Sequence, residues 1–131
     1  MGSKSDYLEN ELLDHVLRNS AYSAPAAVYL ALFTADPGEA GSLANEVSAG
    51  DYSRQAITFG TAAASGSISN TTLITFTAAA ANNWGTITHW AICDASTSGN
   101  VLYYGALDVS RAVGIGDSCE VPIGDLTVTE D

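Results

Sequence analysis

The sequence predicts a mainly β protein, an antiparallel β-sandwich of about seven short strands preceded by one N-terminal α-helix. Short runs rich in β-branched and aromatic residues recur along the chain, and glycine, asparagine and serine turn signals separate them. Only one stretch, near the N-terminus, has apolar residues at helical spacing. The 131 residues are enough for a single domain, which we divide into a helix at 5–20 and a β-sandwich at 26–131.

The N-terminal helix is predicted from one apolar stripe. Asp6 is expected to be the N-cap, with Glu9 as its capping-box partner. The stripe either covers the sheet of its own domain or docks on a neighbouring subunit. Its members are Leu8, Leu12, Leu13, Val16 and Leu17.

The first predicted strands follow this helix. Residues 26–35 are apolar on both faces, which is typical of a central strand, whereas residues 52–59 alternate like a half-buried strand. Residues 67–77 predict one or two strands with a break near Asn70. Pro122 argues that the strand containing it lies at a sheet edge. The last segments are 109–113, which is ambiguous, and the strand patterns 119–123 and 126–129.

A long loop separates the first two strand patterns. It opens with the turn Asp36-Pro37-Gly38-Glu39 and continues to Gly50. Connections of this length are uncommon in compact domains and are often functional. The loop is therefore a candidate for contact with a partner.

The central element is a β-hairpin predicted at residues 84–107. Two apolar runs flank a loop of small and polar residues. Alternation along the first run places Ile87, His89 and Cys93 on one face and Trp90 on the other. Neither face is cleanly polar, so we expect both faces of the hairpin to be at least partly covered.

The charge balance excludes several partners. Fifteen acidic residues against four basic ones give a formal net charge of −11. The basic residues are too few and too scattered to follow a phosphate backbone, so we expect no nucleic-acid partner, and an anionic membrane is disfavoured for the same reason. No apolar run is long enough to cross a bilayer, and the first residues do not resemble a signal peptide. We expect the product to stay in the cytoplasm where it is made, unless it leaves as part of a larger assembly.

Candidate chemistry is sparse. His15 and His89 have no closely spaced partners for a metal, and no catalytic or phosphate-binding motif is present. His89 and Cys93 share a strand face, which is more simply explained by core packing than by a nucleophile and its base. We expect no enzyme activity, no metal and no cofactor. The sequence does not say whether Cys93 and Cys119 lie close together.

Several segments together resemble a family of small virion proteins of tailed bacteriophages, whose members are described as tail-fibre-like, minor tail or capsid decoration proteins. The resemblance extends from about residue 7 to residue 129. It rests on the helix at 7–18 and on Val28-Tyr-Leu-Ala-Leu-Phe-Thr-Ala-Asp-Pro-Gly38, Tyr52-Ser-Arg-Gln-Ala-Ile-Thr-Phe59, Trp84-Gly-Thr-Ile-Thr-His-Trp-Ala-Ile92 and Leu102-Tyr-Tyr-Gly-Ala-Leu107. It implies a structural virion protein and transfers no catalytic residue.

Two functions are compatible with this resemblance. The first is a capsid decoration or cement protein on the capsid exterior, with the major capsid protein and copies of itself as partners. The second is a tail or tail-fibre component that contacts the host surface. For partner contact we select residues of the helix and the long loop, which the sandwich explains least. They are Leu8, Leu12, Val16, Asp36, Pro37, Glu39, Leu43 and Val47.

Overall fold

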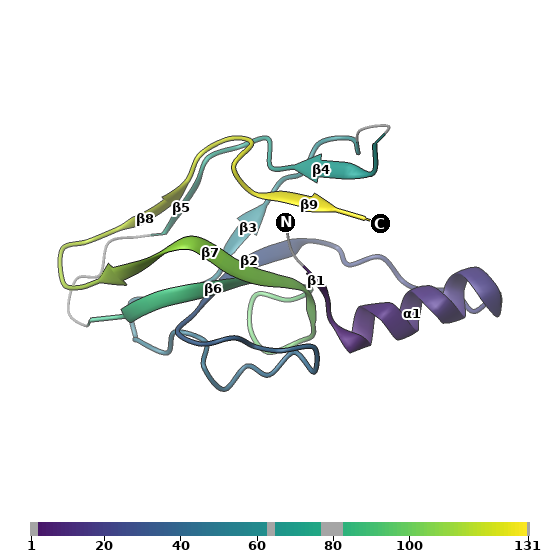
Figure 1. Ribbon diagram of the computed structural model, residues 1–131, viewed down its shortest axis with the longest axis horizontal. Coiled ribbons are helices and arrows are strands. Elements are labelled where there is room, and N and C mark those ends of the chain that lie inside the picture. The colour runs from purple at the N-terminus through teal and green to yellow at the C-terminus, as the bar shows by residue number, and fades with distance from the viewer. Residues whose placement is uncertain (1–2, 63–64, 77–82, 131) are drawn as a thin grey trace.

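The computed structural model describes residues 3–62, 65–76 and 83–130. Within these ranges the chain forms one helix and nine strands (Figure 1). The elements are β1 (Ser3–Lys4), α1 (Asp6–Leu17), β2 (Val28–Phe33), β3 (Gln55–Ile57), β4 (Ser67–Ser69), β5 (Ile74–Phe76), β6 (Gly85–Cys93), β7 (Val101–Val113), β8 (Cys119–Val121) and β9 (Thr127–Thr129). The predicted mainly β fold with one N-terminal helix is confirmed.

The strands form one main sheet and two ribbons. The main sheet has five antiparallel strands in the order β1-β7-β6-β2-β3. The predicted hairpin is its β6–β7 pair. One ribbon pairs β4 with β9 and the other pairs β5 with β8, so the C-terminal strands reach back to the middle of the chain. Figure 1 shows both ribbons on the same side of the main sheet, which makes the arrangement sandwich-like.

The main sheet buries apolar side chains on both of its faces. The larger core lies between the sheet and the ribbons and joins Leu32 and Trp90 of the sheet to Phe76 and Val128 of the ribbons. The smaller core occupies the opposite face, where Leu43 of the loop after β2 packs against it. Its buried members are Ala31, Phe33, Ala91, Cys93 and Val101. The expectation that both faces of the hairpin are covered is confirmed.

The hairpin differs from the predicted one in two respects. Strand β7 does not end near residue 107 but continues to Val113, through the segment that the sequence left ambiguous. The β6–β7 register shifts between Ile87 and His89, and Ile87 lies in the larger core with Trp90. The predicted face of Ile87 is therefore wrong, because strict alternation cannot anticipate a β-bulge.

The remaining strands lie where the sequence predicts them but are shorter: the strand predicted at 52–59 is β3, Gln55–Ile57, and the one predicted at 26–35 is β2, Val28–Phe33. The predicted break near Asn70 is confirmed, since β4 ends at Ser69 and β5 starts at Ile74. Thr77, the last residue of that predicted segment, lies outside the described residues. Strand β8 pairs with β5 alone, and it ends before Pro122 instead of containing it.

Candidate interaction surface

Helix α1 leaves most of its apolar stripe uncovered. Figure 1 shows the helix extending away from the sheet, with its N-terminal turn nearest to the strands. Only Leu8 is buried. Leu13, Val16 and Leu17 are 55%, 70% and 75% exposed, and Leu12 is half-buried. The sheet of the same chain therefore buries the stripe only at the first turn of α1. The rest of the stripe is free to dock on a neighbouring subunit.

The uncovered part of the stripe lines a shallow groove of about 450 Å³. Four apolar side chains form most of its lining, and Lys4 and Glu9 stand beside them. The apolar members are Leu12, Leu13, Val16 and Leu17. An apolar helix face of this kind is the surface that helix-in-groove recognition uses.

Ser5 fixes the helix to the sheet. It is 1% exposed, and its backbone N–H donates to the carbonyl of Leu102 at 2.9 Å. Its Oγ donates to the carbonyl of Val101 and accepts the N–H of Leu8 at 3.3 Å, so Ser5 is the N-cap. The predicted N-cap, Asp6, is instead the first helical residue, and the helix spans 6–17 where 5–20 was expected. β1 places Ser5 against β7, and the sequence pattern gave no sign of that short strand.

The long loop packs against the second face of the sheet. Its opening turn is confirmed by a hydrogen bond from the N–H of Gly38 to Oδ1 of Asp36 at 2.8 Å. A Cβ at Gly41, where φ is +68°, would lie 3.1 Å from Cβ of Val101. Glycine therefore permits both the backbone conformation and the close approach of the loop to β7.

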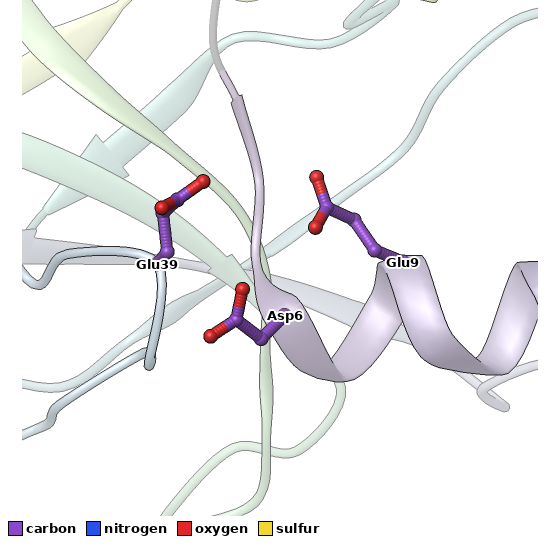
Figure 2. Close-up of side chains that lie close together, drawn as sticks. All are labelled: Asp6, Glu9 and Glu39. Carbon is purple, nitrogen blue, oxygen red and sulfur yellow. The ribbon is translucent and has the colours of Figure 1, made fainter.

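Helix and loop meet at an acidic junction. The N–H of Asp6 donates to the carbonyl of Glu39 at 2.8 Å. Figure 2 shows the carboxylates of Asp6 and Glu9, from the first turn of α1, near that of Glu39, and one oxygen of each lies within 4.8 Å of the others. Burial, and then these carboxylates with that of Asp36, raise the pKa of Tyr104 beside them. Carboxylate oxygens are ligands that hard cations prefer, but exposed acidic groups are common without an ion.

The eight residues selected from the sequence divide by exposure. Leu8, Pro37 and Val47 are buried within the chain itself, and Leu43 is partly buried. Val16, Asp36 and Glu39 are exposed, and Leu12 is half-buried. Leu13 and Leu17 belong to the same stripe and are more exposed than Leu12, so helical spacing could have added them. That these residues contact a partner remains a prediction.

The two cysteines are buried, and the ring nitrogens of the two histidines lie within hydrogen-bond distance of neighbouring groups. Burial raises the pKa of the Cys93 thiol to about 11, so the thiolate form of a nucleophile is disfavoured. Cys93 lies in the smaller core and Cys119 in the larger one, and both are free. Nδ1 of His89 lies 2.8 Å from Oγ1 of the neighbouring Thr88. The absence of enzyme activity remains a prediction.

The fold and the surface together define a small β-rich protein in which the apolar face of α1 is not covered by the rest of the chain. The profile of a protein family described as podophage GP4 fiber I protein gp80 matches residues 3–129. The chain belongs to this family of tailed-phage virion proteins, which confirms the resemblance seen in the sequence. A search of curated proteins finds no match. The 12-residue α1 is not long and apolar enough to cross a membrane, and no other helix occurs in the described ranges.

Proposed function

We propose that this chain is a structural component of a podophage fibre, attached to another virion protein through the uncovered apolar face of α1. The family description supports the fibre, since the matched profile covers residues 3–129. The exposure of Leu13, Val16 and Leu17 is the observation that carries the attachment. Full burial of each of these side chains against a partner would contribute about 1.5–3 kcal/mol of binding free energy.

The charge around the helix specifies the partner. Asp6, Glu9 and Glu11 lie in the first two turns, and Asp14 already pairs with Arg18 at 3.0 Å. A complementary surface therefore needs an apolar groove with a basic rim. A second copy of a chain with a net charge of −11 would bring like charges together. We therefore place any contact between copies, which the sequence led us to expect, outside α1.

Particle incorporation of a helix variant tests the attachment. The triple variant Leu13→Ser, Val16→Ser, Leu17→Ser should fold but be lost from purified particles, because these side chains contribute little to the folded chain. The matched control is Ile115→Ser with Ile123→Ser, which changes side chains that are 61% and 65% exposed outside α1. Normal incorporation of the triple variant, measured by quantitative mass spectrometry, would refute the attachment through α1.

A capsid decoration protein on the capsid exterior, bound to the major capsid protein, is the second candidate. It is favoured by the absence of an internal repeat in the sequence, since fibre shafts are commonly built from repeats. Copy number relative to the major capsid protein separates the two functions. A simple fraction of one-to-one would support decoration of the lattice, whereas a few per cent would support the fibre.

A further inference from the structure

A cavity of about 310 Å³, here called the ribbon cavity, lies between the main sheet and the β4–β9 ribbon. The sheet contributes Ile92 and Tyr103 to its lining, and the ribbon contributes Ile68 and Val128. Ile92 and Val128 are buried members of the larger core, whereas Ala62, also in the lining, is exposed. The ribbon cavity therefore extends from the larger core to the surface of the molecule, and most of its lining is apolar.

The ribbon cavity adjoins the groove along α1. Lys4 lines the groove and Glu130 lines the cavity, and Nζ of Lys4 lies 2.6 Å from Oε1 of Glu130. The hydroxyl of Tyr103 donates to Oε2 of the same carboxylate. Figure 1 shows α1 and the C-terminal end of β9 at the same end of the molecule. Two apolar surfaces therefore meet at one ion pair, whose opposite charges offset each other.

The groove alone offers too little area for a stable interface. Full burial of a large aliphatic side chain contributes about 1.5–3 kcal/mol at roughly 25 cal/mol per Å², which corresponds to about 60–120 Å² for each side chain. The four apolar side chains of the groove therefore offer about 500 Å² at most. A stable interface buries roughly 800 Å² on each partner. The attachment surface must therefore extend beyond α1, and the ribbon cavity is an apolar surface that adjoins it.

We propose that the groove along α1 and the ribbon cavity form one binding surface for a single virion protein. This inference rests on the proposed attachment through α1 and deepens it. The partner inserts a large apolar or aromatic side chain into the ribbon cavity and covers the apolar face of α1, with basic residues opposite the acidic first turns of the helix. Lys4 and Glu130 then lie beneath the partner, where the loss of water strengthens their attraction. A second copy of the chain is disfavoured as the partner, because two net charges of −11 repel each other.

Photo-crosslinking in purified particles tests whether one partner covers both sites. The photoreactive amino acid p-benzoylphenylalanine replaces Ala62 at the ribbon cavity in one variant, Leu17 on α1 in a second, and exposed Ala112 of β7 in the control. After irradiation, mass spectrometry should identify the same virion protein crosslinked to positions 62 and 17, and the control should give no crosslink to that protein. Different proteins at the two positions, a second copy of this chain at position 62, or no crosslink at position 62 would overturn the proposal.

Blocking the cavity separates this inference from the attachment through α1. In particles assembled from equal amounts of variant and parent chain, Ala62→Trp should be incorporated about tenfold less than the parent, and Ala112→Trp should be incorporated equally. Loss of both Ala62→Trp and the triple variant of α1 supports one shared surface. Loss of the triple variant alone leaves the attachment through α1 intact and refutes the role of the ribbon cavity, whereas loss of Ala62→Trp alone refutes both. If Ala62→Trp fails to fold, which thermal unfolding detects, the crosslinks decide.

Discussion

Arg54 shows how much a single residue can connect. Its guanidinium forms two hydrogen bonds at 2.8 Å with the carboxylate of Glu46 and donates to the carbonyls of Ala95 and Ser98, both at 2.8 Å. The side chains of Arg54 and Glu46 are 3% and 14% exposed. The pair therefore ties the long loop to the β6–β7 hairpin. Nothing in the alternating pattern of residues 52–59 distinguishes this arginine from an exposed one.

Removing Arg54 should be costly. Arg54→Ala leaves the Glu46 carboxylate without its cation, and breaking a buried pair in this way costs about 3–5 kcal/mol of unfolding free energy. Urea denaturation followed by tryptophan fluorescence measures the loss. Arg18→Ala is the control, because the Arg18–Asp14 pair is exposed and should contribute about 0.5 kcal/mol or less. Similar losses in the two variants would contradict the structural role of Arg54.

Asn70 gives a second prediction at this scale. Its amide donates to the carbonyls of Thr72 and Pro122, and its oxygen accepts the N–H groups of Gly124 and Leu126. Asn70→Asp turns an oxygen toward two carbonyls and should cost about 2–4 kcal/mol at neutral pH. Thermal unfolding can compare it with the same change at exposed Asn45, which should have little effect. The sequence placed a break near Asn70, but composition does not reveal which asparagine is buried.

At the scale of elements, the local sequence pattern predicted those features that depend on residues close together in the chain. The hairpin and the split near Asn70 were both predicted, because apolar alternation and turn signals lie within a few residues of each other. The face of Ile87 and the start of α1 were not. Both depend on β7, whose bulge and whose pairing with β1 join residues far apart in the sequence.

The start of α1 can be tested directly. Ser5→Ala removes the N-cap oxygen and the hydrogen bond to Val101, and we expect a loss of about 1–2 kcal/mol. Asp6→Ala should change the unfolding free energy by less than about 0.5 kcal/mol, since its carboxylate also stands among like charges. Chemical denaturation of the two variants compares the caps. A larger loss for Asp6→Ala would restore the capping assignment made from the sequence.

At the scale of the whole molecule, side chains join β1 and β7 to Glu130, the residue that follows β9. Nζ of Lys4 lies 2.6 Å from Oε1 of Glu130, and the hydroxyl of Tyr103 donates to Oε2. Burial alone would raise the pKa of Glu130, but the hydrogen bonds from Lys4 and Tyr103 outweigh it and lower that pKa below its ordinary value of 4.5. The carboxylate is thus favoured in the folded state.

This shift predicts an acid sensitivity. A lowered pKa in the folded state stabilises the protein above the ordinary pKa, and that contribution is lost as the pH falls through the lowered value. Between about pH 6 and about pH 3, Glu130→Gln should therefore lose less unfolding free energy than the parent chain. The control is Glu120→Gln, which lacks an ion-pair partner among the described residues. Parallel pH curves for Glu130→Gln and the parent would contradict the role of Glu130.

The interaction surface was only partly predictable for the same reason as the fold. Helical spacing identified the stripe, and loop length identified the second segment. Which members remain accessible depends on tertiary packing: Val47 joins the larger core, whereas Leu17 at the end of α1 is 75% exposed.

The pairing of β4 with β9 also governs when the fold can be completed. During synthesis, β4 has no partner until residues 127–129 have left the ribosomal tunnel, and β5 must wait for β8. The sheet side of the larger core is therefore translated before both of the ribbons that cover it are complete. Such distant pairing slows folding and leaves apolar surface open to aggregation. The larger core can therefore close only after both C-terminal strands, β8 and β9, have left the tunnel.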